Sequence, residues 1–143
     1  MSWPAGPWVA DTSAWARASA SAVAPSWKRA AAAGELVACP IVTLELLYRA
    51  SDGQQVERTA AACAALSQAP VTRTVTDAAL MAIRELASRG PAGNHRVRVP
   101  DALIAAAAAE RGVGVLHYDR HFDRLAEVLE FDSRWIAPPG TLS

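Results

Sequence analysis

The chain has 143 residues, a length that suits a single domain (residues 1–143) with a substantial buried core. Hydrophobic residues make up 52% of the sequence and charged residues 20%, a balance that argues against a disordered chain. The formal net charge of +0 excludes a global electrostatic attraction to nucleic acid, so any basic surface has to be local.

The first half of the chain alternates short apolar runs with helical segments. In chain order, it is predicted to contain a strand at 8–10, helices at 12–17 and 21–33, a strand at 36–39, and helices at 41–50 and 54–67. Thr12 or Ser13 is expected to cap the first helix, and Gly34 to end the second. Pro40 fits the first turn of the third helix.

The second half continues the alternation. It is predicted to contain a strand at 71–74, helices at 76–89 and 100–111, a strand at 113–118, a helix at 120–129 and an edge strand at 131–136. Thr76 is expected to cap its helix, and Pro100 opens an alanine-rich one. Strands alternating with helices of this length predict an α/β fold, with a mostly parallel sheet covered on both faces.

Nothing in the sequence indicates a membrane or a disulfide framework. The longest apolar run, at 102–109, is too short to span a bilayer, and the N-terminal residues lack the pattern of a signal peptide. We therefore expect a cytoplasmic protein. Cys39 and Cys63 lack metal-site spacing and are expected to be buried free thiols.

Two aspartates follow predicted strands. Asp11 ends the run at 8–10, and Asp119 ends the run at 113–118. The carboxyl ends of parallel strands meet at one edge of a sheet, where α/β proteins bind their ligands. Each aspartate alone is an ordinary helix cap. Two of them on parallel strands begin to describe a site.

Glu45 has an unusual place in its predicted helix. Helical spacing puts it on one face with three apolar residues, Ile41, Leu44 and Tyr48. An unpaired charge in a buried apolar stripe is costly, so Glu45 needs a partner. A functional role is the favoured interpretation, and an arginine partner or a side chain that reaches solvent is the alternative.

Asp101 follows Pro100 at the start of the alanine-rich helix, where the helix dipole favours an acid. That helix leads into the strand before Asp119, so its first turn returns to the same edge of the sheet. Two carboxylates about 4 Å apart repel by roughly 4 kcal/mol at an effective dielectric constant near 20. A divalent cation removes this repulsion, and ligands that are all oxygen indicate Mg²⁺ or Mn²⁺.

Four segments around these acids resemble, in order, the motifs of PIN-domain nucleases. They are residues 8–14 (WVADTSA), 43–47 (TLELL), 99–105 (VPDALIA) and 116–123 (LHYDRHFD). The likeness is greatest to the VapC-type ribonuclease toxins of bacterial toxin–antitoxin pairs. It covers nearly the whole chain, including the tail at 135–138 (WIAP).

This resemblance implies a three-layer α/β/α fold, Mg²⁺ or Mn²⁺ as cofactor, and cleavage of RNA by metal-activated water. It implies an antitoxin protein as partner, and we expect a homodimer. The implied site residues are the catalytic acids Asp11, Glu45, Asp101 and Asp119, of which Asp11, Asp101 and Asp119 are metal ligands, with Thr12 and Ser13 holding a ligand or a phosphate.

The last motif departs from the family pattern. Many relatives carry a second acid where this chain has His121, which puts a second metal ion in doubt. His121 is either a ligand for a softer ion such as Mn²⁺, a substrate contact, or a surface residue of its helix. Asp123 either replaces the lost acid, or is solvated or paired with an arginine.

Other residues have two readings. Arg96 and Arg98 precede Asp101, and either guide RNA phosphates or form a solvated pair. His117, on a buried strand, is expected to be a core histidine. Three tryptophans either anchor a dimer or an antitoxin, or simply pack: Trp3, Trp15 and Trp27.

The leading hypothesis is a metal-dependent endoribonuclease that acts as the toxin of a toxin–antitoxin pair. One alternative is a catalytically degenerate PIN-like domain that mainly binds a partner protein, because His121 replaces an acid. A relative with the same acids that cleaves DNA is the other alternative.

Overall fold

The computed structural model describes residues 3–143. Five parallel strands form one sheet in the order β3-β2-β1-β4-β5. The strands are β1 (Trp8–Ala10), β2 (Leu36–Ala38), β3 (Ser67–Gln68), β4 (Gly114–His117) and β5 (Ser133–Trp135). The sheet confirms the predicted parallel arrangement and the predicted edge strand near the end of the chain.

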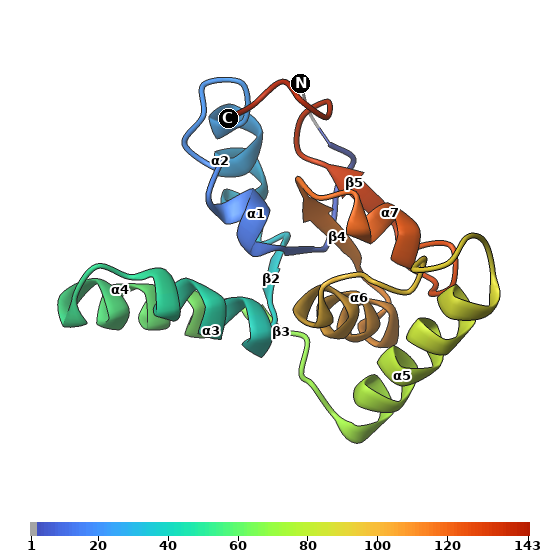
Figure 1. The fold of residues 1–143 in the computed structure, drawn as a ribbon. Helices are drawn as coiled ribbons and strands as arrows, with labels where there is room; N and C mark the ends of the chain where they lie inside the picture. The colour runs from blue at the N-terminus through green and yellow to red at the C-terminus, as the bar shows by residue number, and fades with distance from the viewer. Residues whose placement is uncertain (1–2) are drawn as a thin grey trace.

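The helices cover both faces of this sheet (Figure 1). They are α1 (Thr12–Trp15), α2 (Ala24–Ala32), α3 (Pro40–Arg49), α4 (Gly53–Ala64), α5 (Arg73–Ser88), α6 (Val99–Arg111) and α7 (His121–Leu125). Helices α1 and α2 lie on one side, and α5 and α6 on the other, while α3 and α4 extend away from the sheet as a pair. The three-layer α/β/α fold is thereby confirmed. No helix among residues 3–143 is long and apolar enough to cross a membrane.

Alternation along β1 divides the core into two parts. Val9 packs into a cluster with α5, α6 and α7, whereas Trp8 and Ala10 pack into a second cluster with α1, α2 and the C-terminal tail. Successive side chains of a strand point to opposite faces, so a strand buried on both faces is apolar at every position. The alanines of α6 are buried because this helix lies between the sheet and α5; they are Ala102, Ala105, Ala106, Ala107 and Ala108.

The predicted strand at 71–74 is wrong. The edge strand that pairs with β2 is β3 (Ser67–Gln68), and Ala69 still donates its backbone N–H to the carbonyl of Ala38. Pro70 then ends the pairing, since proline has no N–H to donate to a sheet. Thr72 caps α5 by accepting from the N–H of Val75, so Thr76 is not the cap. The β-branched residues of 71–74 therefore lie at the start of helix α5 and just before it.

Four other predicted caps and boundaries shift. Asp11 caps α1 instead of Thr12 or Ser13, because its carboxylate accepts from the N–H of Ser13. Helix α2 begins at Ala24, three residues late, since 21–23 form a turn. Helices α4 and α7 end at Ala64 and Leu125, where the chain continues in turns.

Candidate metal centre

The candidate site lies at the carboxyl ends of β1 and β4. Asp11 directly follows β1, and Asp119 lies two residues beyond β4. These strands are neighbours, but the chain continues from β1 to β2 on one side and from β4 to β5 on the other. Such a reversal of strand order leaves a crevice where α/β proteins bind their ligands. Asp101, from the first turn of α6, and Glu45, from the middle of α3, reach the same crevice.

Asp11 is 2% exposed and is held by the start of α1. The Ser13 hydroxyl and backbone N–H donate to its Oδ2 at 2.6 and 3.0 Å. The same hydroxyl accepts from the backbone N–H of Tyr118 at 2.9 Å. Ser13 therefore joins the ends of β1 and β4 and fixes one carboxylate oxygen. The other oxygen of Asp11 is buried without a hydrogen-bond partner among the described residues.

Glu45 is held between a hydroxyl and a guanidinium. The Thr12 hydroxyl donates to its Oε1 at 3.0 Å, and Arg98 donates to its Oε2 at 2.9 Å. The predicted buried apolar stripe around it is wrong, because Leu44 is 62% exposed and Tyr48 91% exposed. The arginine partner considered as an alternative is present in Arg98. Glu45 itself retains only 17% of its side-chain exposure.

Asp101 is fully buried, and a guanidinium and an imidazole face its two carboxylate oxygens. Arg98 Nη1 lies 3.8 Å from its Oδ1, and Nδ1 of His121 lies 3.2 Å from its Oδ2. The backbone N–H of Arg98 donates to the same Nδ1 at 3.2 Å. Without a proton this nitrogen accepts from Arg98, and with a proton it donates to Asp101. In the first case two acceptors lie 3.2 Å apart, and a proton on the Asp101 carboxyl relieves that contact.

Asp119 completes the group. Its Oδ1 accepts from the backbone N–H of His121 at 2.9 Å and lies 3.8 Å from Nδ1 of that residue. One ligand atom from each of Asp101, Asp119 and His121 lies within 4.8 Å of the others. Within residues 3–143 this is the one group of three acidic, histidine or cysteine side chains with that geometry. Asp11 is not part of it.

Burial and like charges perturb the acids. Burial raises the pKa of Asp101 to about 8, and the charges of Asp11 and Asp119 act in the same direction, against Arg98. Burial also raises the pKa of Asp11, although the hydrogen bonds from Ser13 lower it in part. Burial opposes the charge on Arg98, but its hydrogen bond to Glu45 and the nearby acids raise its pKa overall.

A divalent cation fits this set of residues. Oδ1 of Asp11 and Oδ1 of Asp101 are both buried without a hydrogen-bond partner in the described part of the chain. A cation would satisfy these oxygens and neutralise the acids that raise each other's pKa values. Two carboxylates with one imidazole suit Mn²⁺, and carboxylates alone suit Mg²⁺.

A chain of hydrogen bonds behind Asp119 was not predicted. The N–H of Asp119 donates to Nδ1 of His117 at 3.2 Å, which leaves Nε2 of His117 to donate to the Ser133 hydroxyl at 2.7 Å. Ser133 donates in turn to Asp123 at 2.7 Å, and so does Nε1 of Trp135. Burial lowers the pKa of His117 to about 4, which keeps it neutral.

This network of hydrogen bonds tests two predictions made from the sequence, for His117 and for Asp123. His117 is fully buried with both ring nitrogens hydrogen-bonded, as predicted for a core histidine. The Asp123 carboxylate accepts hydrogen bonds from Ser133 and Trp135 of β5, so the arginine partner suggested for it is wrong. The only sequence signal for the network was a polar residue, Ser133, within a predicted edge strand.

The remaining candidates from the sequence differ in their contacts. Arg98 contacts two of the acids, whereas Arg96 is exposed and forms no ion pair with the acids among residues 3–143. Trp3 is buried, and Trp15 packs edge-on against Trp27 with ring centroids 5.0 Å apart. Both cysteines are buried free thiols, as predicted.

Fold and site together define an α/β protein with an acidic crevice at the switch point of a parallel sheet. The family model of the PIN domain matches residues 9–128, and the chain belongs to this family. The match confirms the resemblance inferred from the four motifs. Among curated proteins, Ribonuclease VapC18 of Mycobacterium tuberculosis is 36% identical over 132 residues, which cover 92% of this chain and 96% of the relative.

Solved structures share the fold. DNA-bound VapBC from Salmonella typhimurium aligns with a TM-score of 0.68 at 16% identity, covering 91% of this chain and 98% of that chain. A toxin–antitoxin complex from Klebsiella pneumoniae aligns with a TM-score of 0.60 at 16% identity, covering 79% and 87%. At these identities the structures support the three-layer fold alone.

Proposed function

We propose that this protein is a metal-dependent endoribonuclease that acts as the toxin of a toxin–antitoxin pair. The observation that carries the proposal is the convergence of Asp101, Asp119 and His121 beside the orphaned oxygen of Asp11. Membership of the PIN-domain family and 36% identity to a protein named as a ribonuclease support RNA as the substrate. The substrate and the toxin role would place the activity in the cytoplasm.

We propose one divalent cation, Mn²⁺ or Mg²⁺, held by Asp101 and Asp119, with Asp11 as a further ligand. His121 stands where many relatives have an acid, so a second tightly held cation is not expected. When bound, the cation supplies Lewis-acid chemistry that offsets phosphate charge and activates water for hydrolysis. Of these two ions Mn²⁺ is favoured, because Mg²⁺ is held by oxygen ligands and His121 offers a nitrogen.

The chain's own residues prepare this chemistry. Ser13 fixes Asp11 in the rotamer seen here, and Thr12 orients Glu45 toward Arg98. Glu45 is placed to accept a proton from the attacking water, since it is the one of the four acids that is not among the proposed cation ligands. Arg98 is placed to donate hydrogen bonds to a phosphate oxygen once a cation neutralises the charge of the acids.

The proposed partner is a protein that masks this crevice. Solved complexes with the same fold are described as toxin–antitoxin pairs, which motivates a protein antitoxin for this chain. We also propose a homodimer. Expression of the chain alone should arrest growth, and expression together with the product of the adjacent gene should relieve the arrest. Light scattering of the purified chain measures the oligomer.

Cleavage of labelled RNA tests the activity. Structured RNAs, including tRNA, are incubated with the wild-type protein in Mn²⁺ or Mg²⁺, beside DNA of matching sequence. The variants Asp11→Asn and Asp101→Asn should lose about a hundredfold or more in rate. Asp77→Asn, which changes an exposed carboxylate on α5, should cleave like wild type.

Three results would contradict the proposal. Equal cleavage by wild type and Asp11→Asn, with a contaminating nuclease excluded, would show that the acids do not carry the activity. Preferred cleavage of the DNA would assign a different substrate. Absence of cleavage together with absence of Mn²⁺ binding in calorimetry would indicate a degenerate domain whose role is to bind a partner.

A further inference from the structure

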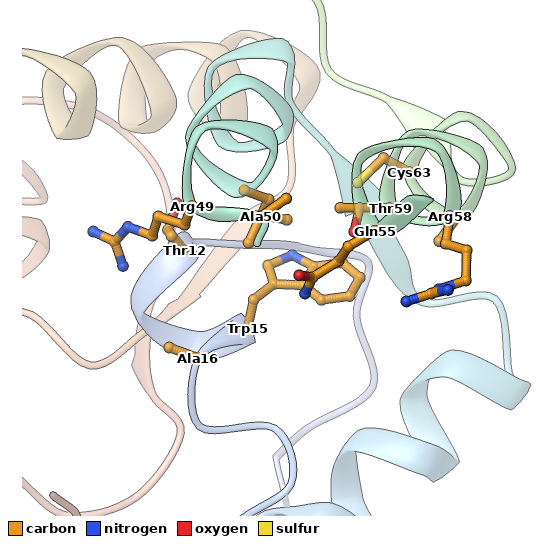
Figure 2. A pocket seen from close by; sticks show the side chains of 11 residues that line it. Thr12, Trp15, Ala16, Arg49, Ala50, Gln55, Arg58, Thr59 and Cys63 are labelled. Carbon is orange, nitrogen blue, oxygen red and sulfur yellow. The ribbon is translucent and has the colours of Figure 1, made fainter. Parts of the chain in front are cut away.

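A separate pocket lies beside the acidic crevice, between α1 and the α3–α4 pair. Its volume is about 400 Å³, within the range of small-molecule sites. Figure 2 shows Trp15 reaching from α1 into this space, with Ala50 from the end of α3 and Gln55 from α4 around it. Trp15 is braced by its edge-on contact with Trp27, so its indole is a fixed wall.

The side-chain amide of Gln55, which also lines the pocket, is held in one orientation by hydrogen bonds. Oε1 of Gln55 accepts from both the N–H and the hydroxyl of Ser51 at 2.7 Å. Its Nε2 is therefore the free end of the amide, and it has no partner among residues 3–143. An amide donor beside an aromatic ring is the combination that recognises a flat ring carrying acceptor atoms, such as a nucleobase.

Two arginines flank the pocket. Arg49, at the end of α3, and Arg58, on α4, are both exposed lining residues (Figure 2). Neither forms an ion pair or a hydrogen bond within the described residues, whereas Arg98 is engaged with the acids. Unpaired guanidiniums beside an aromatic slot complement a ligand that joins a flat ring to negative charge.

One residue links the pocket to the proposed catalytic site. Thr12 lines it, and the same residue donates its hydroxyl to Glu45 at 3.0 Å. This shared residue places the pocket next to the acids, where a nucleotide near the phosphate at the acids can reach it. A pocket in this position can select which phosphate is cut.

We propose that this pocket holds one unpaired base of the RNA strand next to the scissile phosphate, stacked on Trp15 and contacted by Gln55. Arg49 and Arg58 bind the phosphates on either side of that nucleotide. The inference rests on the proposed ribonuclease function and adds the determinant of cleavage position. It predicts a single-stranded segment as the preferred substrate.

The test measures binding in the absence of cleavage. A fluorescein-labelled, single-stranded RNA of twelve nucleotides containing all four bases is titrated with the Asp11→Asn protein in Mg²⁺ by anisotropy. A set of the same RNA carries one abasic nucleotide at each position in turn. Within the same background, Ala62→Trp fills the pocket from the exposed side of α4, and Arg49→Ala and Arg58→Ala remove its cations. Arg84→Ala, an exposed arginine on α5, is the control.

One or two adjacent abasic positions should weaken binding about tenfold, as expected for loss of a stacked base. This position dependence should disappear in Ala62→Trp, which leaves the core residues of the pocket unchanged. Each of Arg49→Ala and Arg58→Ala should reduce the slope of log affinity against log salt by about 0.7. Arg84→Ala should change neither quantity.

The proposal is overturned if every abasic position binds equally, or if the profile persists in Ala62→Trp. It is also overturned if Arg58→Ala behaves like Arg84→Ala. If Ala62→Trp abolishes capture of the adjacent gene product but leaves RNA binding unchanged, the pocket belongs to the partner protein. Base-dependent binding without cleavage by the wild-type chain would refute the nuclease function and leave the pocket assignment intact.

Discussion

Asp101 shows how a single residue can oppose the stability of the fold. Burial and the neighbouring acids raise its pKa from 3.8 to about 8, so the folded chain keeps a proton that the unfolded chain releases. The unfolded state binds fewer protons between these two values, and the free energy of unfolding therefore falls as pH rises from about 4 to about 8. The loss approaches about 1.4 kcal/mol per pH unit from this group alone.

Asp101→Asn should stabilise the metal-free protein, because asparagine is neutral throughout this range. The gain should be small near pH 4 and reach a few kcal/mol, on the order of two to four, at pH 8. Urea denaturation in EDTA at several pH values measures it. Asp77→Asn, on an exposed carboxylate, should stay within about 0.5 kcal/mol of wild type. Equal stability of wild type and Asp101→Asn at pH 8 would show that the crevice does not strain the fold.

Hydrogen bonds between β4 and β5 position Asp119. Ser133 on β5 connects Asp123 to His117, and His117 accepts from the N–H of Asp119. Ser133→Ala leaves a buried imidazole N–H without its acceptor and should destabilise the protein by about 1–3 kcal/mol. It should also weaken Mn²⁺ binding about tenfold or more, as loss of support behind a ligand does.

The hydroxyl separates this positioning role from a general loss of packing. Ser133→Thr keeps the hydroxyl and suits a strand, so it should restore Mn²⁺ affinity measured by calorimetry. Weakened Mn²⁺ binding in both variants would show that the hydrogen-bonded chain does not position Asp119.

The contact between β1 and β4 depends on a glycine. A Cβ on Gly114 would lie 2.6 Å from Cε3 of Trp8 and 2.9 Å from the carbonyl oxygen of Asp132, closer than real contacts allow. Gly114→Ala should therefore destabilise the protein by about 1–3 kcal/mol, because overpacking forces the strands apart. Gly53→Ala, with nothing within 4 Å of its Cβ, is the matched control. Thermal unfolding compares the two, and equal melting temperatures would contradict the close packing.

At the level of elements, the pattern of the sequence predicted most of the fold and the place of the acids. Strand ends at Asp11 and Asp119 could be predicted because apolar runs buried on both faces are continuous. The strand at 71–74 was mispredicted because β-branched residues favour strands, whereas Pro70 and the cap at Thr72 decide the local structure. Glu45 was assigned to the site on a wrong premise, since its apolar neighbours on the helix are exposed.

The rest of the site depends on tertiary contacts that no local pattern encodes. His121 meets Asp101 only because α6 and α7 pack together, and the pairing of Arg98 with Glu45 joins residues 53 positions apart. The pocket around Trp15 arises between three helices, so its members have no common spacing. Sequence spacing predicts positions within an element, and side-chain partners across elements follow from packing.

The molecule as a whole has no net charge, but it concentrates negative charge in one crevice. If a cation binds there, Asp101 has to lose the proton that it holds at neutral pH. Binding of Mn²⁺ at pH 7 should release close to one proton, measured by calorimetry in buffers of different ionisation enthalpy. The cation should also stabilise the fold by about 2.7 kcal/mol at a hundred times its dissociation constant.

His121→Asp separates the identity of the ion from its presence. An all-oxygen set suits Mg²⁺, whereas the imidazole favours Mn²⁺, so this variant should lose part of its preference for Mn²⁺. The ratio of the two dissociation constants, measured for wild type and variant, tests this expectation. An unchanged ratio would remove His121 from the ligands, and the stabilisation by either ion would then depend on the carboxylates alone. Because the acids repel one another without a cation, the fold should be most stable when the site is filled.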